Sequence, residues 1–427
     1  MRVILIHHRL GGYSSHHFNE AHGFMRELER RGDQLVLLVN AQAPAGIVGE
    51  LQAQAVLDDP TFRLEWSFEE RSSRFRKMLH RWVDPLLKAD DRLLLTISTQ
   101  LEAHALTLWS QELPRRKRPW IVILFVSDRW NRSGSDEYER QASEFRKLKA
   151  AIGTLQAEDS ARILFWALTD PLAAELSELL GTSVEVSPIP QILRLPDRRQ
   201  ATLLPHAADS IDTVPRSGDP QSSSTMRSEP PPQRVAILGG TRREKGSYLI
   251  PEIVRACRQL LNVEFLVQLT NNTLTAEETE ILARVAEEPG VTVIRDAMSL
   301  VEYEAALTVS DIALFPYEVL PYRQRISGVF AEAAACGKPV VATAGTWMAG
   351  EIEAGRAAGV IAEDLRPGSI AGAIARCLAE GEPLRQAAQA AAAGWRKRDL
   401  TAFIDFMETQ IILRSREAPS RRAWWRF

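Results

Sequence analysis

The sequence predicts an α/β protein built from two doubly wound units. Two series of short apolar stretches, each alternating with amphipathic ones, run from residue 3 to residue 186 and from residue 234 to residue 343. Alternation of this kind is typical of parallel sheets that are covered by helices on both faces. Between the two series, residues 196–233 are rich in Pro, Ser, Asp and Arg and contain no aromatic residue. Such a stretch buries too little apolar surface to order itself, so we expect it to be a flexible linker.

Length and composition limit the possible domain organisation. The chain has 427 residues, of which 45% are hydrophobic and 25% are charged, as in ordinary globular proteins. One core of this size is unusual. We therefore expect residues 1–195 and 234–398 to form separate domains, followed by a helix at 399–414 that packs back toward the first domain and a basic, aromatic tail at 415–427. The net charge of −3 gives no reason to expect nucleic acid as a partner.

The cysteines and the chain start favour a cytoplasmic protein without a metal centre. The three cysteines lie far apart, and none has the spacing of metal ligands, so we expect reduced thiols. The chain begins directly with a strand rather than with a signal-peptide core. No run approaches the roughly 18 apolar residues that a membrane span needs. We expect neither a metal ion nor a cofactor.

The first domain is predicted to open with a strand at residues 3–6, a glycine turn and an amphipathic helix at 15–31. Further apolar stretches predict strands at residues 34–39, 92–96, 120–126, 163–168 and 184–186. Gly11 and Gly12 let the backbone approach a ligand closely at the end of the first strand, although an ordinary tight turn explains them equally well. Asp128 follows the strand at 120–126, at the sheet edge where we expect a cleft.

Residues 60–90 carry the pattern of a basic amphipathic helix. Phe75, Met78, Leu79 and Trp82 recur at helical spacing, and the cationic residues lie between residues 71 and 81. Such a helix rests on an anionic membrane in some proteins and packs on its own domain, with a solvated basic face, in others. The tail at 415–427 mixes arginines with large aromatic residues and allows the same two interpretations, a lipid interface or a disordered or self-packed end.

The second domain is predicted to repeat the α/β pattern. Strands are expected at residues 234–238, 263–269, 291–294, 312–316 and 339–343, and helices at 247–261, 276–288 and 301–309. Alanine-rich helices follow Pro367, and the helix near 401–414 carries its apolar residues on one face. The polar loop after residue 316 lies where open α/β sheets bind ligands, at the carboxyl end of a parallel strand.

Glu332 is the most informative residue of this domain. It lies on a predicted helix that begins at Ser327 and Gly328 and is otherwise made of Val, Phe, Ala and Cys. A carboxylate on so apolar a helix must reach solvent or a partner from elsewhere. Gly328 lies one turn nearer the helix start, where free N–H groups favour an anion. An anion with hydroxyls attached one turn further along, such as a nucleoside diphosphate, would satisfy both the free N–H groups and the Glu332 carboxylate.

A second candidate anion site is the glycine turn at residues 239–246. Its glycines lack the spacing of a dinucleotide fingerprint, and Lys245 precedes Gly246, which reverses the order found in a P-loop. The turn gathers Arg242, Arg243 and Lys245 at the end of a strand, and arginine and lysine both suit phosphate. Three solvated cations are the alternative, but two such sites in one domain favour a bound diphosphate.

These motifs resemble retaining GT-B glycosyltransferases of the glycosyltransferase family 4 type (glycosyl transferases group 1). The likeness covers most of residues 234–365 and, more weakly, residues 1–195. It implies two Rossmann-like domains that face a cleft, and a sugar transferred from a nucleotide-diphosphate sugar without a metal. Arg242, Lys245 and Glu332 match the family's catalytic positions. The positions implied to bind the donor are Gly11, Gly12, Gly240, Tyr322, Arg325, Ser327, Gly328 and Val329.

The sequence departs from the family pattern in three places. Gln324 stands where the family has a first glutamate near the sugar, Ser127 and Asp128 stand where it often has a histidine, and the linker is long. Tyr13, Asp128 and Gln324 are the candidates to contact the acceptor or the sugar. A helix cap or an ion pair is the alternative role for Asp128.

The resemblance therefore predicts a glycosyltransferase, hexosyltransferase-like and linked to polysaccharide biosynthesis. Its partners would be a nucleotide-sugar donor and a sugar or lipid-linked acceptor, in the cytoplasm or at the inner face of the membrane. A catalytically weak binding or scaffold protein is one alternative. Another is a different GT-B enzyme such as an epimerase, although the second domain holds no histidine for acid–base chemistry.

Overall fold

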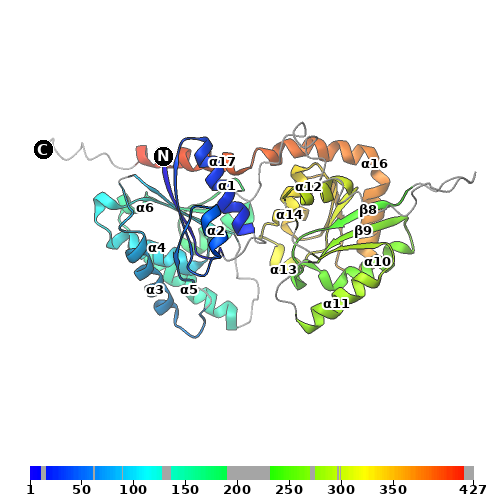
Figure 1. Cartoon of the computed structure of the whole chain (residues 1–427), viewed down its shortest axis with the longest axis horizontal. Coiled ribbons are helices and arrows are strands. Elements are labelled where there is room, and N and C mark those ends of the chain that lie inside the picture. Colours follow the sequence, from blue (N-terminus) through cyan, green and yellow to red (C-terminus); the bar gives the residue numbers. More distant parts are fainter. Residues whose placement is uncertain are drawn as a thin grey trace, which may run out of the picture. The chain divides into compact units, whose positions relative to one another are not determined.

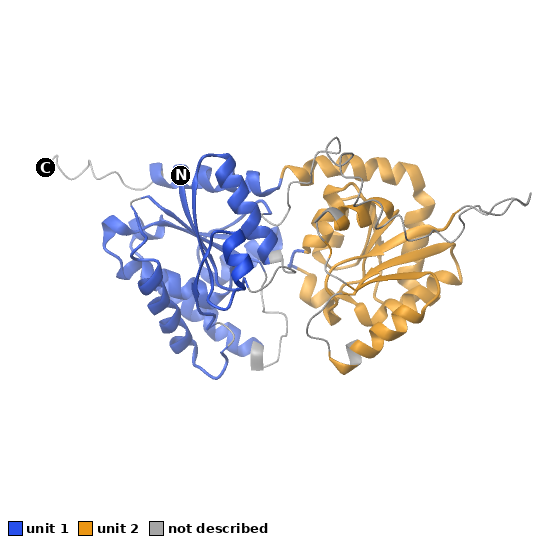
Figure 2. Ribbon diagram, viewed as in Figure 1, with its two compact units in different colours: residues 1–193, 324–326, 398–427 blue, residues 194–323, 327–397 orange. Residues whose placement is uncertain are grey.

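In the computed structural model, two compact units form, each around one parallel sheet (Figures 1 and 2). The structure describes residues 1–10, 16–60, 63–88, 90–126, 136–189, 231–269, 275–295, 298 and 300–417. Unit 1 comprises residues 1–193, 324–326 and 398–427, and unit 2 comprises residues 194–323 and 327–397. Among the described residues, no helix combines the length and the hydropathy that crossing a membrane requires.

Unit 1 contains a seven-stranded sheet in the order β3-β2-β1-β4-β5-β6-β7, with every pair parallel. Its strands are β1 (Arg2–His7), β2 (Gln34–Asn40), β3 (Gln54–Leu57), β4 (Arg92–Ser98), β5 (Trp120–Phe125), β6 (Ile163–Ala167) and β7 (Val184–Val186). Its helices are α1 (His16–Arg30), α2 (Ala45–Glu50), α3 (Phe68–Trp82), α4 (Gln100–Glu112), α5 (Asp136–Gly153), α6 (Ala157–Ser160), α7 (Asp170–Leu180) and α17 (Leu400–Glu417), with a 3-10 turn η1 (Arg115–Lys117).

Both faces of the unit 1 sheet are buried. Ile4 and Ile6 of β1 belong to one hydrophobic cluster with residues of α3, α4, α5 and α7. Leu5 is also fully buried and, by the alternation of a strand, faces the opposite side. Helices α1 and α17 contact each other, and Phe24 of α1 meets Phe403 of α17 edge to face with ring centroids 5.8 Å apart. The C-terminal helix is thus part of unit 1.

Unit 2 repeats this topology with six strands in the order β10-β9-β8-β11-β12-β13, again all parallel. Its strands are β8 (Gln233–Ile237), β9 (Val263–Gln268), β10 (Val291–Ile294), β11 (Ile312–Phe315), β12 (Val340–Thr343) and β13 (Gly359–Ala362). Its helices are α10 (Ile250–Arg258), α11 (Ala276–Glu287), α12 (Leu300–Val309), α13 (Val319–Tyr322), α14 (Gly328–Ala335), α15 (Trp347–Glu353) and α16 (Pro367–Arg396), with 3-10 turns η2 (Arg243–Lys245) and η3 (Ser247–Leu249).

Each sheet has one point at which the strand order reverses. In unit 1 the chain moves outward from β1 to β3 and then returns to place β4 beside β1. In unit 2 it moves outward from β8 to β10 and returns to place β11 beside β8. The loops that leave the two central strands turn in opposite directions at such a point and leave a crevice for a ligand. The fold therefore indicates candidate ligand sites at the carboxyl ends of β1 and β4 in unit 1 and of β8 and β11 in unit 2.

The apolar side of α3 belongs to the core of unit 1. Phe75 and Leu79 are fully buried, and Met78 packs with them in the same cluster. Most of its cations have carboxylate partners: Arg71 pairs with Glu144, Arg74 with Glu70, Arg76 with Glu112, and His80 with Asp84 and Glu112. The apolar side chains that would enter a membrane are therefore inside the protein. Residues 418–427 of the tail lie outside the described part of the chain, so a membrane contact through the tail stays a prediction.

Candidate functional site

The turn after β8 approaches the start of α14 closely. Gly239 has a φ of +100°, and its N–H donates a hydrogen bond to Gln268 Oε1 over 2.8 Å. A Cβ at Gly239 would lie 2.9 Å from Val329 Cγ2 and 3.1 Å from Lys245 Nζ. These distances place the lysine ammonium and the first turn of α14 next to each other beside the glycine. Gly239 was not among the residues predicted from the sequence to bind the donor; the adjacent Gly240, which was, is partly buried.

The basic turn is fixed to the end of β11. Gly246 has a φ of +72°, and a Cβ there would lie only 2.0 Å from the carbonyl oxygen of Pro316. The N–H of Glu318 donates to the carbonyl oxygen of Glu244 over 2.9 Å, and Ser247 Oγ donates to the carbonyl oxygen of Arg242 over 3.0 Å. Only glycine fits both this conformation and this approach. The turn therefore holds Lys245 at the reversal point of the sheet.

Helix α14 presents free N–H groups at the same place. Ser327 precedes the helix, and its Oγ accepts a hydrogen bond from the N–H of Phe330 over 3.2 Å. The N–H groups of Gly328 and Val329 belong to the first helical turn, where no intrahelical acceptor exists. Phe330 is fully buried and packs edge to face with Phe315, Trp347 and Trp395. This aromatic cluster anchors the helix, so its amino end has a defined position.

Glu332 lies one turn further along α14, in a poorly hydrated setting. Burial raises the pKa of its carboxyl to about 7, although the neighbouring Tyr303 hydroxyl and the charge of Lys245 both act in the opposite direction. Burial and the neighbouring Glu332 in turn raise the pKa of the Tyr303 hydroxyl well above its usual range. Lys245 Nζ also lies over the ring of Tyr317, 5.7 Å from its centroid. Lys245 thus lies close enough to Glu332 for its charge to act on the carboxyl, while the roles of both residues in binding a donor stay predictions.

The other two cations of the basic turn point elsewhere in this structure. The Arg242 guanidinium is 48% exposed and lies 3.8 Å from a carboxylate oxygen of Glu244. The Arg243 guanidinium lies over the ring of Tyr248, 4.7 Å from its centroid. Lys245 is therefore the cation that the structure brings to the start of α14, and the role of Arg242 stays a prediction.

The loop between α13 and α14 is divided between the two units. Tyr322 is buried in unit 2, with its ring 4.5 Å from that of Tyr317. Gln324 and Arg325 fall in unit 1. There the Gln324 side-chain amide donates to the Glu175 carboxylate, and Thr169 Oγ1 donates to the Gln324 carbonyl oxygen over 2.7 Å. The amide of Gln324 is thus engaged with α7 in unit 1.

Several predicted residues lie outside the described part of the chain. These are Gly11, Gly12, Tyr13 and Asp128. Their proposed contacts with donor, acceptor or sugar remain predictions.

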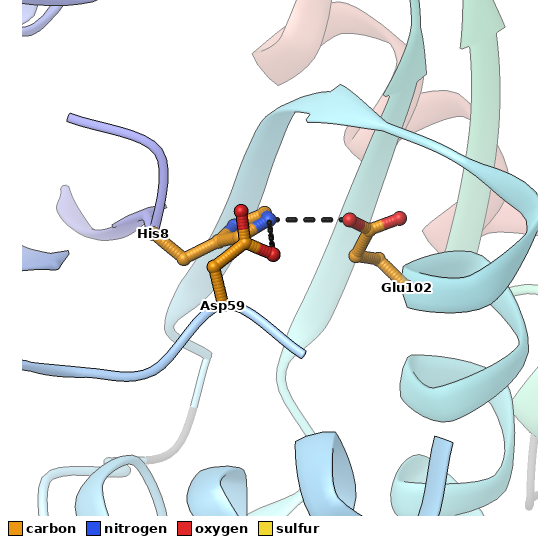
Figure 3. A group of neighbouring side chains, drawn as sticks. All are labelled: His8, Asp59 and Glu102. Carbon is orange, nitrogen blue, oxygen red and sulfur yellow. Dashed lines mark hydrogen bonds and ion pairs between the residues drawn. The ribbon is translucent and has the colours of Figure 1, made fainter. Parts of the chain in front are cut away.

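One further group of polar side chains lies in unit 1 and was missed by the sequence argument. His8, Asp59 and Glu102 have ligand atoms within 4.8 Å of one another, and they are the group among the described residues that is close enough to hold a metal ion (Figure 3). The signal available in the sequence was weak, because His8 simply follows a strand and Glu102 reads as an ordinary N-terminal helix residue.

Comparisons with known proteins agree with this architecture. The model of the family described as glycosyl transferases group 1 matches residues 232–380, which lie in unit 2. No curated protein matches the chain. The solved structure of the Candida albicans trehalose-6-phosphate phosphatase N-terminal domain is 12% identical, covers 97% of both chains and superposes with a TM-score of 0.67.

Two other structural neighbours come from bacteria. A glycosyltransferase from Rickettsia africae is 10% identical with a TM-score of 0.62, over 96% of this chain and 98% of its own. HepE from Anabaena, solved in complex with UDP, is 13% identical with a TM-score of 0.63, over 96% and 99%. This chain has the GT-B fold. The match of the family model to unit 2 adds that this unit is glycosyltransferase-like.

Proposed function

We propose that the protein is a glycosyltransferase that uses a nucleotide-diphosphate sugar as donor. The observation that carries this proposal is the meeting of Lys245, the free N–H groups of α14 and Glu332 around Gly239. A pyrophosphate between the lysine and the helix start would be stabilised by both. Glu332 lies one helical turn further along α14, where its carboxylate would accept hydrogen bonds from the hydroxyls of an attached ribose. Anabaena HepE, a structural neighbour, has been solved with UDP and with UDP-glucose.

The proposed reaction moves a sugar from the diphosphate to an acceptor hydroxyl. The bond between the anomeric carbon and the phosphate oxygen breaks, and its electron pair leaves with the nucleoside diphosphate. The acceptor oxygen forms the new bond to the anomeric carbon, and its proton passes to the departing phosphate. Lys245 and the N–H groups are preorganised for the negative charge that develops on the phosphate. Retention of configuration, a hexosyl donor, independence of metal and a role for Arg242 are part of the proposal through the family resemblance.

Binding of nucleotides tests the proposal directly. A ligand that binds only the folded state raises its stability, so UDP, GDP and their sugars should raise the unfolding temperature of the full-length protein. The Lys245→Ala and Glu332→Gln variants should lose most of this shift, while the exposed Lys397→Ala variant should keep it. Absence of a shift with every nucleotide, or an equal shift in all variants, would contradict the proposal.

A turnover assay separates the enzyme from a binding or scaffold protein. Gln324 in place of a glutamate, and its engagement with Glu175, favour the binding protein as the second candidate. A glycosyltransferase should release nucleoside diphosphate from its donor in the presence of a saccharide panel. Nucleotide binding without any turnover would favour the scaffold. Interconversion of UDP-sugars without transfer would instead favour an epimerase.

The proposed place of action is the cytoplasm or the inner face of a membrane. This location rests on the reduced cysteines and the basic, aromatic tail. The paired cations and buried apolar face of α3 give that helix a structural role, so the tail carries the proposed membrane contact.

A further inference from the structure

The reversal point of the unit 1 sheet carries a cluster of four charged or ionisable residues. Three of them, His8, Asp59 and Glu102, are drawn in Figure 3, and the fourth is Arg9, which pairs with Asp59 and Glu102. His8 and Arg9 follow β1, Glu102 lies in the first turn of α4 after β4, and Asp59 follows β3. Because β1 and β4 are the strands between which the order reverses, the cluster occupies the place in unit 1 that Gly239 and Lys245 occupy in unit 2. Its position is that of a ligand site.

Glu102 is the buried centre of this cluster. His8 Nε2 donates to Glu102 Oε1 over 3.1 Å, and Arg9 Nη2 donates to the same oxygen over 2.7 Å. The other oxygen accepts from the N–H and hydroxyl of Thr99, as in an ordinary capping box. Burial alone raises the pKa of Glu102, but the charge of Arg9 and the hydrogen bonds of His8 and Thr99 outweigh burial and hold the pKa well below its usual range.

A helix cap does not by itself explain this arrangement. A capping box needs one carboxylate oxygen, yet here the second oxygen is buried with a guanidinium and an imidazole. Burying charges is costly, and replacing such groups with apolar residues is often neutral or stabilising. His8 is only 1% exposed, and within the described residues its Nδ1 has no hydrogen-bond partner. The burial of His8 with one ring nitrogen unpaired among the described residues is therefore not explained by the cap.

The two partly exposed members indicate which side is open to a ligand. The side chain of Asp59 is 18% exposed and that of Arg9 is 12% exposed, while Glu102 is inaccessible. Asp59 Oδ1 lies 3.8 Å from His8 Nε2, and Asp59 Oδ2 lies 4.0 Å from Arg9 Nε. Asp59 and Arg9 thus form the front of the cluster, and His8 and Glu102 support them from behind.

The charges of the cluster select among possible ligands. A divalent cation at His8, Asp59 and Glu102 would lie beside the Arg9 guanidinium, which already holds Glu102 Oε1, so the two positive charges would repel each other. A phosphate or carboxylate would meet two carboxylates, whose charge one arginine only partly offsets. A neutral hydroxyl is compatible with the carboxylates and with the Arg9 guanidinium, because it donates to a carboxylate and accepts from a guanidinium.

We propose that Asp59 and Arg9 bind a neutral, hydroxyl-bearing acceptor, with His8 and Glu102 as positioning residues. Asp59 accepts a hydrogen bond from one hydroxyl of the polyol, and Arg9 donates to an oxygen of the same molecule. This inference rests on the proposed transferase function and gives its acceptor a chemical class, an uncharged saccharide rather than a sugar phosphate.

Saccharide binding to the full-length protein tests the inference. The probes are methyl α-glucoside, maltose and sucrose on one side and glucose 6-phosphate on the other, measured by saturation-transfer NMR with and without UDP. The variants are Asp59→Asn and, as a matched control, Asp58→Asn, since Asp58 is exposed beside it. We expect a neutral saccharide to bind the wild type and the control, and to bind Asp59→Asn about tenfold or more weakly, as when a hydrogen bond to a charged group is lost.

Several outcomes would overturn the inference. They are preference for glucose 6-phosphate, equal binding by Asp59→Asn and the control, absence of binding by every saccharide, and stoichiometric binding of Zn²⁺ or Mn²⁺ that Asp59→Asn abolishes. UDP binding, measured in the same samples, keeps the two proposals apart. If UDP binds normally while the saccharide results fail, only the acceptor site is wrong; if UDP does not bind, the transferase proposal itself fails.

Discussion

Glu332 links the chemistry of the site to the stability of unit 2. The pKa of its carboxyl is about 7 in the folded protein, because burial outweighs Tyr303 and Lys245, against 4.5 for an unperturbed glutamate. Between these two values the folded state holds a proton that the unfolded chain has lost. The stabilisation from this group is therefore complete below pH 4.5 and is lost as pH rises through about 7.

The first prediction is that Glu332→Gln makes the stability of the folded protein less dependent on pH. Glutamine resembles the protonated acid, so the variant and the wild type should have similar stability near pH 5. Toward pH 8 the variant should become the more stable by up to about 3 kcal/mol, at about 1.4 kcal/mol per pKa unit. Urea unfolding at several pH values measures the difference, and a constant difference across this range would contradict the prediction.

The second prediction concerns the contact between Gly246 and Pro316. Alanine at position 246 would meet the Pro316 carbonyl oxygen at 2.0 Å in addition to adopting a positive φ. Gly290 is the matched control, because it has a similar φ of +76° but its nearest neighbour would lie 3.8 Å away. We expect Gly290→Ala to cost about 1–2 kcal/mol from backbone strain alone. Gly246→Ala should cost clearly more and should also weaken UDP binding; equal costs would show that the turn is not fixed by this approach.

Some residues of the candidate site were predictable from the sequence and others were not. Glu332 is conspicuous because a charge on an apolar helix needs a partner, and Lys245 because it ends a glycine turn after a strand. Tyr317 gives no such signal, since an aromatic residue after a strand is ordinary core material. His8 and Glu102 are 94 positions apart, and only the parallel register of β1 and β4 brings them together.

Among the elements, α17 shows how the end of the chain completes unit 1. Phe403 is fully buried and packs edge to face with Phe24 of α1 and Trp166 of β6, with ring centroids 5.8 and 5.5 Å apart. Arg31 and Arg92 of unit 1 form ion pairs with Asp405 and Glu408 of the helix. The apolar face of this helix was evident in the sequence, but the surface that it covers required the structure.

The third prediction is that Phe403→Ala destabilises unit 1. Removal of a fully buried phenylalanine typically costs about 3–5 kcal/mol. Leu413→Ala on the same helix is the control, because Leu413 is 45% exposed and should change stability by less than about 0.5 kcal/mol. Chemical unfolding followed by near-ultraviolet circular dichroism measures both variants. A small effect of Phe403→Ala would mean that α17 does not belong to the cooperative unit.

For the whole molecule, the alternation of strands and helices predicted two doubly wound units, and the structure confirms this fold class. The strand orders were not evident, because every strand is a short apolar run and the sequence does not say which neighbours pair. The sequence also does not indicate that Gln324–Ile326 belong to unit 1, since this depends on contacts with Thr169 and Glu175, which are far away in the chain.

The fourth prediction is that the tail gives the whole protein a weak affinity for anionic membranes. Residues 415–427 contain four arginines, two tryptophans and a phenylalanine. A basic residue near an anionic surface contributes about 1 kcal/mol, and tryptophans favour the headgroup region. We expect the full-length chain to float with vesicles that contain phosphatidylglycerol, and to do so less at high salt because charge attraction is screened.

Two variants assign this affinity to the tail or to α3. A chain that ends at Glu417 lacks the aromatic residues and most of the arginines of the tail but keeps α17, so it should lose vesicle binding while its UDP-induced stabilisation is unchanged. Replacement of Arg81, an exposed cation of α3, by alanine should have little effect, since the apolar face of that helix is buried in unit 1. Undiminished flotation of the shortened chain would place the membrane contact elsewhere. Flotation that depends on Arg81 would place it on α3, and would mean that its cations act at a lipid surface without any insertion of apolar side chains.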